Sequence, residues 1–395
     1  AAGEVMICSS EGTYSFHSTA VSEQEYRLFA ERFGKACADK IVSNSGLLSG
    51  AALRQAGLTM PVVGQAEIDD YALETARSIA QISGMALAEL KKHLSSRTRE
   101  LTEKLAAPFT PVAGVSGQAD TNRLDAGFVW SPGSVISGAE TPEPVKLDSD
   151  VVTLQKYRNG VVVVNLCDRS SKNTFSPEFV SGVIEAFEHI NNTPGYKAVV
   201  LTGYDNYFAC GGTKQGLLAI QNGSARFTDE QSYSMPLACE IPVIAAMQGH
   251  AIGAGWAMGL FCDWAAYSEE SVYQSPYMLY GFTPGAGSTL IFPERLGHDL
   301  SREVLLTARE FQGRELKRRG MAMPVMPRRE VFDYALALAN HLALSTRDQL
   351  VRQKNRRSES IRQRLPDVFA RELAMHDKTF VGNQDVIDNI NRHFN

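Results

Sequence analysis

Two glycine-rich segments of this chain could stabilise negative charge on a substrate oxygen. They read Phe-Ala-Cys-Gly-Gly at 208–212 and Gly-His-Ala-Ile-Gly-Ala-Gly at 249–255. Glycine lets the backbone approach a ligand closely because no Cβ atom intervenes, and preorganised N–H groups stabilise an oxyanion as it develops. The two segments together therefore predict an oxyanion hole for a reaction that passes through an enolate.

Each glycine-rich segment is expected to lie between a buried strand and a helix. The apolar runs 197–203 and 241–248 precede them, and both are rich in β-branched residues, as buried parallel strands are. Ligands of open α/β layers bind at the carboxyl ends of such strands. A simpler interpretation is that the glycines only allow tight strand-to-helix packing, but the presence of two such turns favours the functional one.

The two glycine-rich turns, together with residues 280–289 and 314–325, resemble the crotonase (enoyl-CoA hydratase/isomerase) superfamily. The resemblance covers about 150–395 and implies an α/β fold, a spiral of ββα turns with a helical C-terminal part. It also implies that the oxyanion donors are the amides of Cys210 and Ala254. The substrate pocket is then expected to include Gly211, Gly253, Tyr277 and Tyr280.

Hydration is not expected, because two carboxylates typical of the hydratases are missing. The positions that carry them in this superfamily read Ala257 and Tyr277 here. Addition of water to a conjugated double bond needs one group to deprotonate the water and another to protonate the α-carbon. A reaction without a general base fits these residues better.

Residues 204–213, 239–250 and 375–380 are more closely similar to the decarboxylating branch of the superfamily, found in polyketide β-branching cassettes. The resemblance implies that a carrier-protein-bound 3-methylglutaconyl thioester is converted to 3-methylcrotonyl thioester. Loss of CO2 leaves a dienolate whose charge reaches the thioester oxygen, where an oxyanion hole stabilises it. Such an enzyme needs a dry pocket and an acid.

The same resemblance assigns roles to a few charged side chains. His376 matches a histidine that acts as the acid or orients the carboxylate, and its ordinary pKa suits that task. Some members carry a tyrosine and a lysine at the positions of Gly216 and Ile220, so that pair is absent here. Arg226 stands where other members have their lysine and could hold the departing carboxylate; Lys214 is a further candidate cation. The alternative interpretation is that these are exposed surface residues.

The charge and the cysteine spacing of the chain indicate which partners and metal ions to expect. A net charge of −5 and a pI near 6.0 give no electrostatic case for nucleic acid or an anionic membrane. The six cysteines lack the spacing of a zinc site, so no metal is expected. Reduced thiols in a cytoplasmic protein are the expected state of these cysteines. No cofactor is expected, and the substrate is expected to be carried on the phosphopantetheine of an acyl carrier protein or CoA. An acyl carrier protein, other copies in a homo-trimer or hexamer, and neighbouring domains of a larger synthase are the expected partners.

Part of the N-terminal segment repeats part of the C-terminal one at an offset of 263 positions. Among the repeated residues, Phe29, Gly50 and Tyr71 recur as Phe292, Gly313 and Tyr334. Residues 1–106 are therefore predicted to be a partial, helical crotonase-like repeat without either oxyanion turn. Residues 107–147 read as a linker rich in Pro, Gly and Ser, and 148–395 as the complete catalytic domain.

Several alternatives stay open at this point. The partial repeat over residues 1–106, which we call the half-copy, is either a degenerate module kept for packing or a sign that the chain belongs to a longer synthase. Its amphipathic helices are expected to dock on the complete domain or to mediate self-association, unless they form an independent bundle. Besides the decarboxylase, a crotonase-fold isomerase or hydratase and a catalytically silent module that binds a carrier protein are the other candidate functions.

Overall fold

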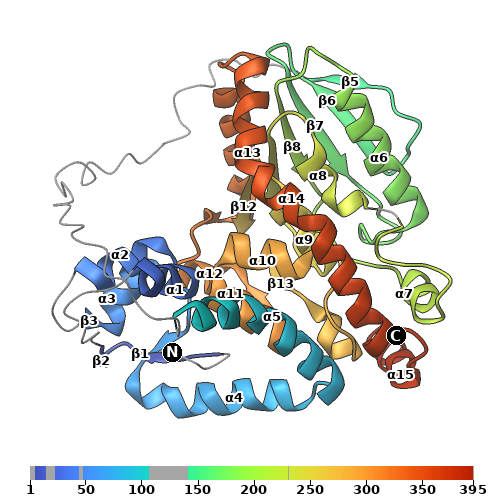
Figure 1. The fold of residues 1–395 in the computed structure, drawn as a ribbon. Coiled ribbons are helices and arrows are strands. Elements are labelled where there is room, and N and C mark those ends of the chain that lie inside the picture. Colours follow the sequence, from blue (N-terminus) through green and yellow to red (C-terminus); the bar gives the residue numbers. More distant parts are fainter. Residues whose placement is uncertain (1–4, 15–22, 44–47, 106–140, 230, 395) are drawn as a thin grey trace.

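The structure is a computed structural model that describes residues 5–14, 23–43, 48–105, 141–229 and 231–394. Figure 1 shows two packed parts. We call the described residues of 5–105 the N-terminal unit and those of 141–394 the main unit. Among the described residues, no helix has both the length and the apolar character needed to cross a membrane.

A seven-stranded sheet forms one layer of the main unit. Its strand order is β15-β12-β10-β8-β7-β6-β5, antiparallel from β5 to β7 and parallel from β7 to β15. The strands are β5 (Glu143–Val145), β6 (Val152–Lys156), β7 (Val161–Leu166), β8 (Ala198–Thr202), β10 (Val243–Met247), β12 (Trp264–Ser268) and β15 (Val325–Met326). The helices α6 (Pro177–Asn191) and α13 (Arg328–Leu342) pack on opposite faces, which explains why β8 and β10 are buried along their whole length.

A smaller sheet continues the strands of the first. Its order is β14-β13-β11-β9, with β9 (Tyr207–Ala209), β11 (His250–Ile252), β13 (Val272–Gln274) and β14 (Phe311–Gln312). The chain passes from β8 to β9 and then into α7 (Lys214–Gln221), and from β10 to β11 and then into α9 (Ala254–Phe261). This repeated strand, strand, helix order is the crotonase spiral, so the predicted fold class is confirmed.

The C-terminal part of the main unit is helical, as predicted. It contains α10 (Ser288–Leu296), α11 (His298–Thr307), α12 (Gly313–Arg318), α14 (Arg347–Thr379) and α15 (Gln384–His393). The short helix α8 (Met235–Ala238) and the 3₁₀ turns at Ser232–Ser234 and Pro276–Tyr280 come earlier in the chain, between the strands. The long helix α14 begins with a capping box between Thr346 and Gln349. The buried Lys354 ties this helix to the sheet, since its ammonium group lies 3.0 Å from Asp263 and donates to two backbone carbonyls.

The N-terminal unit consists of short strands and helices. They are β1 (Cys8–Ser9), β2 (Thr13–Tyr14), α1 (Glu23–Phe33), α2 (Lys35–Ser43), β3 (Leu48–Ser49), α3 (Gly50–Gln55), β4 (Val62–Val63), a 3₁₀ turn at Gln65–Glu67, α4 (Ile68–Ala80) and α5 (Gly84–Leu105). Most of the linker predicted over 107–147 lies outside the described residues. Its predicted end at 147 is wrong, because β5 already belongs to the sheet of the main unit.

The internal repeat extends further upstream than the sequence indicates. Strand β2 pairs with β3 in the same antiparallel register in which β13 pairs with β14. The Tyr14 hydroxyl accepts a hydrogen bond from the Ser9 amide at 2.8 Å, and the Tyr273 hydroxyl accepts one from the Ser268 amide at 2.9 Å. The repeat therefore begins near Cys8 and includes the strands that precede the helices.

Candidate active site

The two glycine-rich turns meet at one cavity of the main unit. Strands β9 and β11 run parallel, with Ala209 beside Ala251, so the turns that follow them lie next to each other. The cavity encloses about 30 Å³, room for a water-sized group but not for an acyl chain. Its lining residues are Cys210, Gly211, Gly212, Leu217, Phe227, Ile252, Gly253, Ala254, Pro276, Tyr277, Tyr280 and Phe394.

Two backbone amides in this lining are placed to act as oxyanion donors. Ala254 is the first residue of α9, and its amide has no acceptor among the described residues. The Gly212 amide likewise has no acceptor there. A Cβ atom on Gly211 would lie 3.9 Å from the Ala254 nitrogen, so the turns approach closely. The positive end of the α9 dipole adds to the attraction for a negative oxygen.

The prediction that the Cys210 amide is an oxyanion donor is wrong in this structure. That amide donates a hydrogen bond to the carbonyl oxygen of Asn173 at 3.0 Å. Asn173 in turn donates from Nδ2 to the carbonyl oxygens of Leu166 and Phe208, so it holds the turn in place. The donor on this turn is therefore Gly212, two residues later, which the sequence analysis missed. Burial raises the pKa of the Cys210 thiol to about 12, which excludes a thiolate nucleophile.

His376 is buried in the last turn of α14 and does not line the cavity. Its Nε2 atom lies 2.9 Å from the carbonyl oxygen of Thr283, while Nδ1 is buried without a hydrogen-bond partner. The ring of Phe227, which does line the cavity, lies against the imidazole with centroids 5.0 Å apart. Burial lowers the pKa of His376 to about 4, so the imidazole is neutral near pH 7.

Two tyrosines form part of the cavity wall. The hydroxyl of Tyr277 is buried without a hydrogen-bond partner, and a Cβ atom on Gly253 would lie 3.6 Å from it. Burial raises the pKa of the Tyr277 phenol, which therefore keeps its proton at neutral pH. Tyr280 packs against Phe282 and Phe394 with its ring and has its pKa raised to about 12 by burial.

The structure does not bring the two candidate cations into the cavity. Arg226 is exposed, and its backbone amide donates to the Asp229 carboxylate at 2.7 Å. Lys214 is the first residue of α7 and is half-buried, but it is not part of the cavity wall either. Arg226 directly precedes Phe227, so a backbone displacement of this segment would move both side chains.

No carboxylate side chain belongs to the described lining of the cavity. Ala257, at one hydratase position, is fully buried within α9, and Tyr277 occupies the other. The described residues also contain no cluster of side chains suited to hold a metal ion. The arrangement can stabilise an oxyanion with two amides, but it lacks the acid–base pair needed to add water.

The segment between Thr283 and Thr289 connects the cavity region to α14. Glu372, one helical turn before His376, accepts hydrogen bonds from the amides of Gly287 and Thr289 and from the Thr289 hydroxyl. Burial raises the pKa of Glu372 to about 7, although these hydrogen bonds oppose the shift. The helix that carries His376 is thus held on this segment by a buried carboxyl group.

This fold and site define a member of the enoyl-CoA hydratase/isomerase family. The profile of that family matches residues 156–387, more than half of the chain, and the chain belongs to it. The bacillaene synthase decarboxylase PksI of Bacillus subtilis is 52% identical over 230 residues, which are 58% of this chain and 92% of PksI. The predicted similarity to decarboxylating enzymes of polyketide β-branching is thereby confirmed.

Solved structures agree with this similarity. One comes from a dehydratase/decarboxylase enzyme couple involved in polyketide β-branching; it is 48% identical, has a TM-score of 0.62, and covers 64% of this chain and 99% of its own. The ECH2 decarboxylase domain of CurF from Lyngbya majuscula is 39% identical with a TM-score of 0.59, and covers 62% of this chain and 99% of its own. Both relatives are thus matched almost completely by less than two thirds of this chain.

Proposed function

We propose that the chain decarboxylates a 3-methylglutaconyl group bound as a thioester to an acyl carrier protein, giving the 3-methylcrotonyl thioester. The observation that carries the proposal is a cavity wall with two acceptor-free amides, at Gly212 and Ala254, and no carboxylate. The similarity to PksI supports the same reaction class. Hydration is disfavoured because no pair of carboxylates lies at the cavity.

In the proposed reaction, the bond between the γ-carbon and the distal carboxylate breaks and CO2 leaves. The electron pair of that bond enters the conjugated system and reaches the thioester oxygen as a dienolate. The Gly212 and Ala254 amides then donate to this oxygen, and their hydrogen bonds strengthen as its charge grows. A proton delivered to the γ-carbon completes the product.

His376 is the proposed acid. Its Nδ1 atom has no hydrogen-bond partner and can donate only after it has gained a proton. A substrate carboxylate beside this atom would favour the imidazolium form. The substrate carboxylate would therefore raise the pKa of His376 on binding, and the same proton would pass to the dienolate. This requires Phe227 to move, because its ring separates the cavity from the imidazole.

If the segment that carries Phe227 moves, Arg226 can contact the substrate carboxylate. The guanidinium is one residue away, and a displaced 226–227 segment can turn it toward the carboxylate. Replacement of Arg226 by alanine should then raise KM more than it lowers kcat, while Lys214→Ala serves as a matched control on α7. Equal KM values in both variants and the wild type would remove Arg226 from the proposal.

Basic residues are frequent on α14 between 352 and 364, but only some of them are exposed to a carrier protein. Lys354 is buried, Arg362 donates to the Leu237 carbonyl, and Arg364 pairs with Glu294 at 2.5 Å. Arg352 and Arg356 remain exposed on α14 and are the residues available to an acidic partner.

Intact-mass analysis of a 3-methylglutaconyl-loaded carrier protein, incubated with the chain, tests the proposal. The expected result is the loss of one CO2. A gain of water would overturn the argument from the missing carboxylates. No change in mass with retained binding would instead leave two alternatives. A shifted double bond in the recovered thioester, detected by NMR, would favour an isomerase, and an unaltered thioester would favour the silent carrier-protein-binding module.

A further inference from the structure

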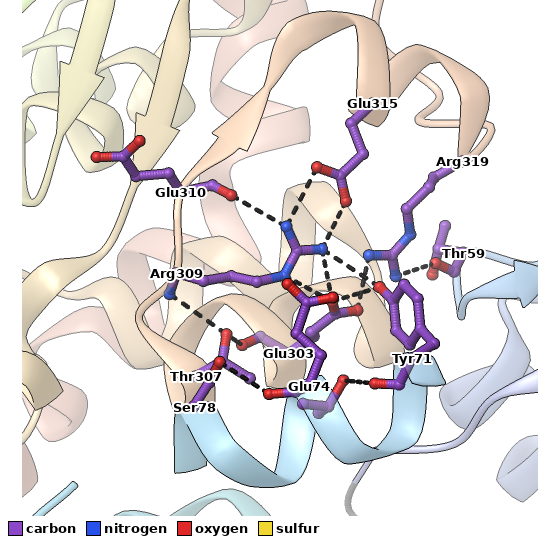
Figure 2. A network of polar contacts seen from close by, with 11 residues as sticks. Thr59, Tyr71, Glu74, Ser78, Glu303, Thr307, Arg309, Glu310, Glu315 and Arg319 are labelled. Carbon is purple, nitrogen blue, oxygen red and sulfur yellow. Dashed lines mark hydrogen bonds and ion pairs between the residues drawn. The ribbon is translucent and has the colours of Figure 1, made fainter. Parts of the chain in front are cut away.

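The N-terminal unit docks on the main unit through a buried polar network (Figure 2). The hydroxyl of Tyr71, on α4, donates to Glu303 of α11 at 2.8 Å. Arg319 pairs with Glu303 at 2.6 Å and donates to the backbone carbonyl oxygen of Thr59 at 2.8 Å. Because Glu303 is fully buried and paired with two arginines, the two units meet there in a defined geometry.

A second contact of the N-terminal unit lies beside the helix that carries His376. Helix α5 packs along α14, and Glu89 of α5 pairs with Lys378 of α14 at 2.9 Å. One helical turn further along α5, the Nε2 atom of His93 lies 3.1 Å from the Thr289 hydroxyl. The N-terminal unit thus contacts the segment 283–289, which is hydrogen-bonded to α14.

The Thr289 hydroxyl links His93 to the buried carboxyl group of Glu372. When Glu372 is ionised, Thr289 Oγ1 donates its single hydrogen to the carboxylate at 2.7 Å, and His93 is then the donor to Thr289. A hydroxyl that accepts one hydrogen bond becomes a stronger donor to the next group. His93 therefore strengthens the contact by which Glu372 holds α14.

The same segment sets the position of His376. Thr283, at its start, accepts a hydrogen bond from His376 and also contacts the Thr379 hydroxyl at 3.2 Å. At its end, Thr289 is bonded to Glu372 and His93. A shift of the segment at Thr289 would thus be transmitted to the imidazole through a short stretch of buried chain.

We propose that His93 is a positioning residue for His376, acting from the N-terminal half-copy through Thr289 and Glu372. This inference rests on the proposed function for its kinetic consequence. The family profile matches residues 156–387, which lie within the main unit, so His93 lies outside the part of the chain that the profile matches. The half-copy is then part of the catalytic apparatus although it lacks both oxyanion turns.

The test compares His93→Leu with His93→Gln, whose amide nitrogen can still donate a hydrogen bond. We expect His93→Leu to lower kcat about tenfold with little change in KM, and His93→Gln to restore most of the loss. Tyr71→Phe, which weakens the remote network of Figure 2, is the matched docking control and should leave kcat unchanged. A purely structural role would lower the melting temperature of His93→Leu and leave its kcat unchanged.

A second readout does not depend on substrate. Hydrogen–deuterium exchange should increase over 283–289 and 372–380 in His93→Leu, but not in His93→Gln or Tyr71→Phe. If the wild type releases no CO2 while this exchange pattern appears, the proposed function fails and the positioning role stands. If the wild type is active and His93→Leu changes neither kcat nor exchange, the positioning role is overturned.

Discussion

The Nε2 atom of His376 lies 2.9 Å from the carbonyl oxygen of Thr283, and this contact determines which ring nitrogen is available to a substrate. A carbonyl oxygen only accepts hydrogen bonds, so Nε2 carries the hydrogen of the neutral ring. Nδ1 is then a bare acceptor in a buried site without a partner. His376 can therefore act as an acid only after Nδ1 has taken up a proton.

The first prediction concerns the pH dependence of decarboxylation. Because the pKa of His376 in the free protein is lowered to about 4, nearly every molecule must gain a proton when substrate binds near pH 7. We expect kcat/KM to fall roughly tenfold per pH unit between about pH 6 and 9, while kcat stays flat over the lower part of that range. Steady-state kinetics with the carrier-bound substrate measures both. A pH-independent kcat/KM would show that no proton is taken up, and another acid, such as the protonated phenol of Tyr277, would replace His376.

The second prediction removes one oxyanion donor without removing a side chain. Ala254 is the first residue of α9, where proline is conformationally tolerated and puts its ring Cδ in place of the amide hydrogen. We expect Ala254→Pro to fold normally but to lower kcat about 10²- to 10³-fold. Ala254→Ser, which keeps the amide, is the control. Equal activity of the proline and serine variants, at equal melting temperatures, would exclude this amide from the oxyanion hole.

The regular elements could be predicted from the sequence because their signals are local. Apolar runs such as 197–203 became β8, and the glycine-rich turns fell where expected, after β9 and β11. The Cys210 assignment failed because it depends on a long-range partner. Only the folded chain brings the Asn173 carbonyl to that amide and leaves the Gly212 amide without an acceptor.

The extent of the repeat was hidden by a change of spacing. Four fewer residues separate Tyr14 from Phe29 than separate Tyr273 from Phe292, so the gapless comparison ended at Phe29. The side-chain hydrogen bond of Tyr14 shows the equivalence that the sequence offset conceals. The position of Arg226 was equally beyond a sequence argument, because exposure of a loop side chain is decided by how neighbouring segments pack.

The third prediction uses two buried groups whose pKa values shift in opposite directions. The pKa of Glu372 is raised from 4.5 to about 7, so its contribution to stability is present below pH 4.5 and is lost as pH rises through 7. The pKa of His376 is lowered from 6.5 to about 4, so its contribution is present above pH 6.5 and is lost as pH falls through 4. Between about pH 4.5 and 6.5 the two slopes oppose each other.

Replacing either Glu372 or His376 should therefore reveal how the remaining group changes the free energy of unfolding with pH. In Glu372→Gln, the free energy of unfolding should rise with pH from about 4 to 6.5, by at most about 1.4 kcal/mol per pH unit relative to the wild type. In His376→Gln it should fall as pH rises from about 4.5 to 7. Urea denaturation at a series of pH values gives these slopes, and curves parallel to the wild type in both variants would contradict the assigned pKa shifts.

The last prediction displaces His376 without changing it. A Cβ atom on Gly285 would lie 2.6 Å from Cε1 of His376 and 3.2 Å from the Phe227 ring. The added methyl group would force the His376 imidazole to shift and strain its hydrogen bond to Thr283. Gly285→Ala should therefore lower kcat about tenfold or more. Gly195→Ala is the control, since its added methyl group meets no atom within 4 Å. If the Gly285 variant keeps full activity and the wild-type melting temperature, the imidazole position seen here is not the one required for catalysis.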